Sequence, residues 1–260
     1  MKRSTAIIAV LLGCIGLVSI VLLLFRGSAD VEGTLFVAVQ NTATSQTSVE
    51  ALNLTIKNIE LWDADQGWIS VLEDEQIVDI LDLPTPTELS QVYLPVGSFQ
   101  RMRLEITAVE VTLPATDTTE ATTHNAALLS QFISFDLPVT IQDDEETSVL
   151  FDIAGADSLY TTITGSRAFI PYITVRTFTN TDLGQLDELT TITAEPTVTG
   201  RFGMNSAGAM QEGYRLPRSA RLEERGGSII ITQPSPKQET FFETTQPQEQ
   251  TTLSDVPVLE

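Results

Sequence analysis

The sequence predicts an all-β fold, an antiparallel β-sandwich that follows one N-terminal membrane helix and precedes a largely disordered tail. Apolar and polar residues alternate with period two through much of 33–178, as in half-buried strands. About seven to nine such segments are separated by turn residues, which is typical of a sandwich. This region also contains no long amphipathic helix. Together these observations exclude a helical bundle and an alternating α/β fold.

Two segments show the alternation most clearly. In GTLFVAVQ, 33–40, one face carries Leu35, Val37 and Val39. In FISFDLPVTI, 132–141, one face carries Ile133, Phe135, Leu137, Val139 and Ile141. We therefore expect each segment to form a strand with one face in the core.

Two longer segments change parity partway along. In 51–62, ALNLTIKNIELW, the apolar set shifts by one residue near Lys57 and Asn58, and in 101–113, RMRLEITAVEVTL, it shifts near Ala108. A regular strand would expose half of each set, so an extra unpaired residue is expected at each shift. The sequence predicts a β-bulge at both places. The segment QIVDILDL, 76–83, has helical apolar spacing and predicts one or two turns of helix.

Composition limits the chemistry. The chain has 260 residues, a formal net charge of −21, one cysteine and one histidine. The charge disfavours nucleic acid as a partner. A single cysteine and a single histidine exclude a disulfide and the usual zinc sites. No cofactor and no metal is expected, since the acidic run at 143–146 lacks the spacing of a calcium loop.

The N-terminus predicts a membrane anchor. A basic n-region at 1–5 precedes the 20 apolar residues 6–25, which as a helix would be about 30 Å long and could span a bilayer. Lys2 and Arg3 precede the segment, whereas a short tether at 26–32 adds acidic residues after it. The N-terminus should therefore stay inside and the rest of the chain outside, in the periplasm or on the cell surface.

A cleaved lipoprotein is the alternative. Leu11-Leu12-Gly13-Cys14 resembles a lipobox, at which Cys14 would carry the lipid. The chain stays apolar from Ile15 to Phe25, however, and Leu12 is large for its position, so we favour the uncleaved anchor. Cys14 would then be a small apolar side chain facing lipid. Both readings place the chain on the outer face of a membrane.

The segment LPVGSFQRMRLEI, 94–106, carries a family resemblance. Its Pro95, Gly97 and Phe99 fit a turn of prealbumin-like Greek-key sandwiches, in which proline presets the turn and glycine accepts a positive φ. The succession of segments over about 33–177 resembles domain-of-unknown-function family 4382, a β-sandwich of anchored or lipoprotein-like prokaryotic surface proteins. Marker residues of the pattern are Gly67, Trp68, Asp79, Gly97, Arg103, Asp152 and Pro171. The resemblance implies a surface location and no chemistry.

One departure from the family pattern follows the first strand. The family tends to have a Thr-Asp-Ala-Pro turn there, whereas this chain reads Gln40-Asn41-Thr42-Ala43. A ligand site at that turn in relatives would be in doubt here.

Catalytic motifs are not found. His124 is the one histidine that could serve as a base, and its polar surroundings, ATDTTEATTHNAA, indicate an exposed loop. Some prealbumin-like surface domains join a strand lysine to Asn or Asp through an isopeptide bond assisted by a carboxylate, and here Lys57 and Glu105 would be the lysine and the acid. The alternative is an outward lysine at a bulge.

Beyond the sandwich at 33–178, apolar periodicity fades. We expect a partly ordered extension and linker at 179–232, with one or two added strands, the short run GGSIIIT and a weakly basic linker at 203–227. The tail at 233–260 is rich in Thr, Gln, Pro and Glu and predicts disorder.

The sequence as a whole predicts a non-enzymatic, membrane-anchored module of the cell envelope. It would bind an envelope protein or glycan through its loops or edge strands. The alternatives are a hydrolase of envelope glycans that uses two carboxylates, and a structural spacer.

Overall fold

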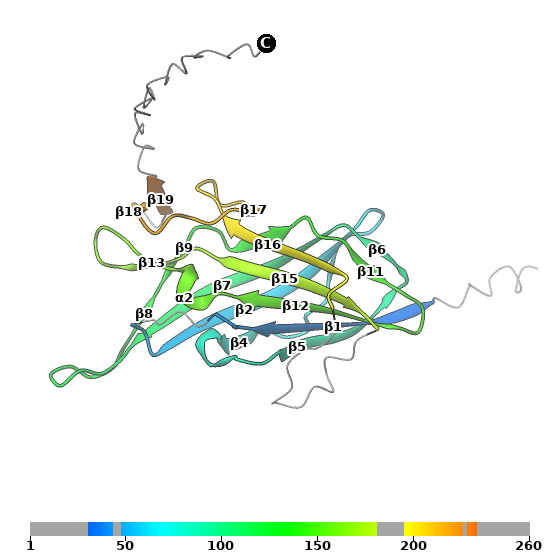
Figure 1. Ribbon diagram of the computed structural model, residues 1–260, viewed down its shortest axis with the longest axis horizontal. Helices are drawn as coiled ribbons and strands as arrows, with labels where there is room; N and C mark the ends of the chain where they lie inside the picture. The colour runs from blue at the N-terminus through cyan, green and yellow to red at the C-terminus, as the bar shows by residue number, and fades with distance from the viewer. Residues whose placement is uncertain (1–30, 44–47, 181–194, 226–227, 233–260) are drawn as a thin grey trace, which may run out of the picture.

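The structure, a computed structural model, describes residues 31–43, 48–180, 195–225 and 228–232, and confirms the all-β prediction. Two large sheets form the body of the molecule, with the smaller pairs around them (Figure 1). Side chains from the two sheets meet in one core. Phe135 of one sheet lies with its ring centroid 5.9 Å from that of Phe151 and 5.1 Å from that of Phe202, both in the other sheet. The molecule is therefore a sandwich of facing sheets.

Sheet A combines the first described strand with strands from the middle and later parts of the chain. Its order is β17-β16-β15-β12-β1-β5, with bounds Met210–Glu212, Val198–Met204, Tyr172–Thr179, Glu146–Ile153, Glu32–Gln40 and Thr87–Pro95. Sheet B has the order β10-β7-β2-β3, with bounds Phe132–Phe135, Arg101–Leu113, Ala51–Asp63 and Gly67–Ser70. In addition, β4 (Gln76–Asp79) pairs with β2, and β8 (Thr122–Asn125) pairs with β7.

Short pairs and turns close the ends of the sandwich. They are β6 (Gly97–Phe99) with β11 (Val139–Ile141), β13 (Leu159–Thr161) with β14 (Arg167–Phe169) and β9 (Ala127–Leu128), and β18 (Arg221–Arg225) with β19 (Ser228–Thr232). The helical turns are η1 (Ile80–Asp82) and α2 (Gly155–Ser158).

Two pairings differ from the antiparallel expectation, because β9 runs parallel to β14 and β1 runs parallel to β12. The central strands β1 and β12 of sheet A run parallel over seven residue pairs, from Thr34 with Glu146 to Gln40 with Asp152. Parallel neighbours need a long crossover, and here the chain passes through all of sheet B between the two strands. Both strands are buried on both faces, as is common for parallel strands.

Both predicted bulges are confirmed, and they lie in one ladder. Between β2 and β7, Thr55 pairs with Ala108, Ile56 pairs with Ile106, and Asn58 pairs with Glu105. Thr107 and Lys57 are thus the extra residues, one on each strand. The two bulges shift the register and then restore it, so the apolar residues before and after them face the same core.

The helix expected at 76–83 forms only in part. Residues 76–79 are strand β4, with Ile77 68% exposed, and only the single 3-10 turn η1 follows. Backbone pairing with β2 takes precedence over the helical spacing. Ile80 is fully buried in that turn, as an apolar residue at one end of the core.

Sheet A continues past residue 178. β16 pairs with β15, and β17 pairs with β16. The segment 203–227 was expected to be a linker. Its described part, 203–225, instead contains the strands β17 and β18 and the buried side chains of Leu216 and Leu222. Among the described residues no helix is long and apolar enough to cross a membrane. The segments 1–5 and 6–25, Cys14 and the tail 233–260 lie outside the described residues.

Candidate binding surfaces

The predicted turn residues lie together, with one correction. Pro95 ends β5, Phe99 is buried at the end of β6, and Gly97 begins β6 opposite Ile141. Gly97 does not have the positive φ that the turn pattern implies. It pairs as an extended residue, so its glycine is not required by a left-handed backbone.

Lys57 and Glu105 meet as an ion pair. The Lys57 Nζ lies 3.0 Å from Glu105 Oε1, and the lysine side chain is 56% exposed. An exposed ammonium at a bulge is the outward arrangement that the sequence left open. The isopeptide bond stays a prediction, and the exposure of Lys57 gives it no support, because such a lysine is expected to be buried.

His124 is exposed and lies on strand β8 rather than in a loop. Its Nε2 is 3.2 Å from Thr122 Oγ1. This contact between neighbours on one strand gives no reason to assign a catalytic role.

The turn that departs from the family pattern is tied to Asp152. This carboxylate accepts hydrogen bonds from Thr42 N at 3.0 Å, Thr42 Oγ1 at 2.6 Å, Gln40 Nε2 at 3.3 Å and Arg176 Nη2 at 3.3 Å. Asp152 is 7% exposed. Both oxygens are satisfied by the protein, so the cluster joins the ends of β1 and β12 and has a structural role.

The outer face of sheet B carries an aromatic cluster around Arg103. Its guanidinium carbon lies 4.2 Å from the centroid of Trp68 and 5.0 Å from that of Phe132, and the side chain pairs with Glu60. Trp62 meets Trp68 edge to face at 5.3 Å. Because the guanidinium already stacks on these rings, the cluster stabilises the sheet face rather than offering free aromatic platforms.

A groove opens where the edges of the two sheets meet. β3 is the last strand in the order of sheet B and β5 is the last in sheet A. Between them lies a depression of about 910 Å³, lined by aliphatic side chains, by the polar residues Ser70, Glu73 and Gln91, and by Tyr93, which is 74% exposed. We call it the edge groove; its lining includes Ile69, Val71, Leu72, Glu73, Val92 and Tyr93. Ser90 Oγ donates to Val71 O and ties the two walls together at depth.

The backbone of β5 presents hydrogen-bonding groups outward. Val96 N donates to Val31 O, and Thr34 N donates to Glu145 O rather than to β5. Since bonded and non-bonded pairs alternate along an antiparallel ladder, Gln91 and Tyr93 direct their N–H and C=O groups away from β1. Among the described residues β1 is the only strand that pairs with β5.

Acidic side chains border the edge groove. Glu73 lines it, and Asp74 and Glu75 follow, all three exposed. Glu88 is the one charged residue of β5 itself. The groove therefore combines a mixed, largely aliphatic lining, an unpaired strand edge and an acidic segment, 73–75, that begins in its lining.

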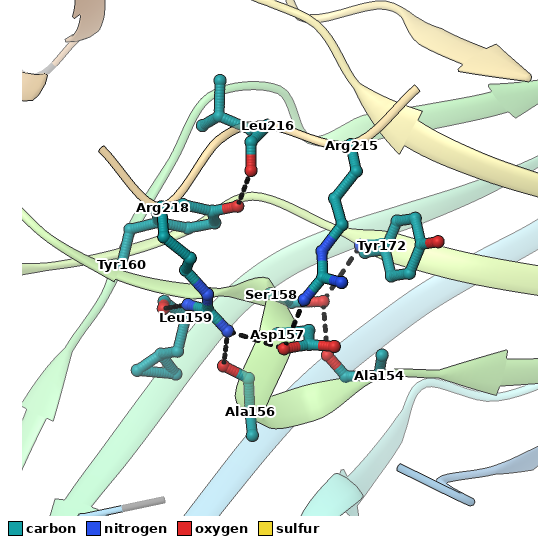
Figure 2. A network of polar contacts seen from close by, with 10 residues as sticks. All are labelled: Ala154, Ala156, Asp157, Ser158, Leu159, Tyr160, Tyr172, Arg215, Leu216 and Arg218. Carbon is teal, nitrogen blue, oxygen red and sulfur yellow. Dashed lines mark hydrogen bonds and ion pairs between the residues drawn. The ribbon is translucent and has the colours of Figure 1, made fainter. Parts of the chain in front are cut away.

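A separate polar network joins α2 to the C-terminal extension (Figure 2). Asp157 Oδ1 lies 2.7 Å from Arg215 Nη2 and 2.7 Å from Arg218 Nη2. Arg218 also donates to the carbonyls of Ala156 and Leu159, while the Tyr160 hydroxyl donates to Leu216 O at 2.8 Å. Burial raises the pKa of Tyr160, and the nearby Arg218 and Arg215 offset part of that shift. The network holds 215–218 against the sandwich.

Neither metal nor two-carboxylate chemistry receives support from this geometry. In the described part of the chain no three metal-ligating side chains come together. The lining of the edge groove includes one carboxylate, that of Glu73, and no second carboxylate with which it could pair. The hydrolase alternative stays a prediction.

Sequence reasoning missed the two places that matter most. β5, TELSQVYLP, has a single charged residue, and nothing local in this segment marks it as the last strand of a sheet. Arg215 and Arg218 were visible as a basic run, but their shared partner Asp157 lies about 60 residues earlier in the sequence.

One family model matches the chain. The model of the family described as "Domain of unknown function (DUF4382)" matches residues 32–170, which is more than half of the chain. Neither a curated protein nor a solved structure matches significantly. The matched residues run from β1 to β14 and include the edge groove, Asp152 and Asp157. The chain therefore belongs to the DUF4382 family.

Proposed function

We propose that the protein is a membrane-anchored, extracytoplasmic binding module of the cell envelope, without enzymatic activity, that binds an extended segment of a partner protein along β5. The sandwich would be of the Greek-key, prealbumin-like kind, held by the anchor at 6–25 and followed by a disordered tail. The observation that carries the binding proposal is the unpaired edge of β5 beside a largely aliphatic groove. Adding a strand to such an edge is a common way to bind a peptide.

The chemistry of the edge groove favours one kind of occupant. The outward amides and carbonyls of Gln91 and Tyr93 fit the backbone of an extended chain, which a glycan lacks. Aliphatic lining residues suit alternate apolar side chains, and the acidic segment 73–75 suits lysine or arginine between them. A second copy of this chain, with a net charge of −21, would bring acidic surface against acidic surface. The proposed occupant is thus a basic, alternating segment of another protein.

Peptide selection tests this proposal. Random decapeptides displayed on phage are selected against the full-length protein in lipid nanodiscs, and an enriched peptide is then synthesised. We expect alternating apolar and basic residues. Gln91→Pro removes one outward N–H, and should weaken that peptide about tenfold, or about 1.4 kcal/mol. Tyr93→Lys should weaken it as well, through charge repulsion and lost apolar contact.

Ile163→Lys is the matched control, because Ile163 is also a large exposed apolar residue, 62% exposed, on a different hairpin. It should leave the affinity unchanged. Enriched peptides that are acidic, or that bind the Gln91→Pro protein as tightly as the parent, would refute strand addition. Preferential binding of soluble glycans would mean that the edge groove binds a glycan instead of a protein segment. Dimerisation at low concentration would mean that it binds a second copy of this chain.

The anchor is tested by intact mass. We expect the protein from its host's membrane fraction to have the mass of the chain from Met1 onward, as an uncleaved spanning segment requires. Loss of 1–13 together with added acyl mass would instead make Cys14 the lipid-bearing residue.

A further inference from the structure

Arginines gather at one end of an otherwise acidic molecule. Arg167 on β14 lines the same depression as Arg218 of the extension, while Asp157 is the carboxylate that Arg218 shares with Arg215. Arg167 itself has no ion pair among the described residues. Three guanidinium groups and one carboxylate leave an excess of positive charge. In a chain of net charge −21, solubility gives no reason for this excess.

Two of these arginines line one depression of about 400 Å³. Arg167 and Arg218 form part of its wall, together with Thr161, Tyr160 and Ser48. None of its lining residues is acidic. The nearby Glu224 lies outside the lining and accepts a hydrogen bond from Ser166. We call this depression the arginine pocket.

The guanidinium groups of the arginine pocket are held in place by hydrogen bonds, and some of their N–H groups remain free to donate to a ligand. Arg167 Nη1 donates to Thr161 Oγ1 at 2.7 Å, on the neighbouring strand β13. Arg218 is fixed by the carbonyls of Leu159 and Ala156 and by Asp157, and it stacks on Tyr160 at 5.1 Å. A guanidinium has five N–H groups, so both arginines keep donors beyond these bonds. Figure 2 shows how Arg218 is oriented by its partners.

We propose that the arginine pocket binds a small oxyanion, a carboxylate, phosphate or sulfate group, between Arg167 and Arg218, with the hydroxyls of Thr161 and Ser48 as further donors. Planar guanidinium groups recognise such anions with paired hydrogen bonds. This site is independent of the edge groove, which is acidic and lies between other strands. It would give the protein a small-molecule ligand in addition to a protein partner.

Calorimetric titration of the full-length protein with inorganic phosphate, sulfate and succinate tests the site. Each anion replaces chloride at constant ionic strength, so that a change in the screening of the protein's charges does not produce a heat signal by itself. We expect at least one of the three to bind saturably, and Arg167→Gln to weaken its binding about tenfold. Arg167→Lys keeps the charge but loses the planar fork, and should weaken binding less than Arg167→Gln.

Arg101→Gln is the control, since Arg101 is an exposed arginine paired with Asp136 on the face of sheet B. It should leave anion binding unchanged. Absence of saturable binding by all three anions, or an equal loss in the Arg101 and Arg167 variants, would overturn the proposal. If Arg167→Gln fails to fold, the anion affinities of the Arg167→Lys and Arg101→Gln proteins are compared instead. Weaker binding by Arg167→Lys supports the proposal, and equal affinities overturn it.

Discussion

A chain that ends at residue 170 is expected not to fold. The match to the family ends there, but two strands of sheet A follow: β15 pairs with β12, and β16 pairs with β15. Their removal would take five buried apolar side chains out of the core: Ile173, Val175, Phe178, Phe202 and Met204. At about 2 kcal/mol for each, the loss is about 10 kcal/mol. That is comparable to the whole stability of a typical domain, about 5–15 kcal/mol.

Thermal unfolding followed by circular dichroism checks this prediction. A chain that ends at residue 232 is the control, since it keeps every described strand, and should unfold at the temperature of the full-length protein. The 170-residue chain should show no cooperative transition. A cooperative transition near that of the control would mean that the matched region is a complete folding unit.

Asp152→Ala is expected to have the largest effect of the single substitutions considered. It leaves Gln40 Nε2, Thr42 N and Thr42 Oγ1 without their acceptor, and removes the partner of Arg176. Breaking a buried, hydrogen-bonded charge costs about 3 kcal/mol. In a protein of this size the melting temperature should fall by roughly 10 °C.

Asp136→Ala is the matched comparison. Its carboxylate also pairs with an arginine, Arg101, at 2.8 Å, but the side chain is 83% exposed. Exposed pairs of this kind contribute less than about 1 kcal/mol. If urea unfolding gave the two variants the same loss of stability, the Asp152 cluster would not be what joins β1 to β12.

The strands could be predicted because their information is local. Alternation in 33–40 predicts strand β1 correctly, and the parity shifts at Lys57 and near Ala108 predict the bulges. The single strand expected at 132–141 is wrong, because the segment forms two short strands, β10 and β11, which pair with β7 and β6 respectively. The resemblance to the family was also visible in the order of segments and is confirmed by the match over 32–170.

What the sequence did not reveal depends on distant pairing. The parallel pairing of β1 with β12 joins residues about 110 positions apart, and no local pattern sets its direction. The edge groove needs β3 and β5 each to be last in its sheet, which follows from sheet order alone. The partly helical spacing of 76–83 misled the prediction because backbone pairing with β2 outweighs a short apolar pattern.

Hydrogen exchange of the β5 amides tests strand addition most directly. The full-length protein in nanodiscs is compared with and without a saturating amount of the selected basic peptide. We expect slower exchange in 87–95, because the outward amides of Gln91 and Tyr93 would then donate to the added strand. Slowing confined to other strands, such as β7 and β10 on the outer face of sheet B, would contradict binding along β5.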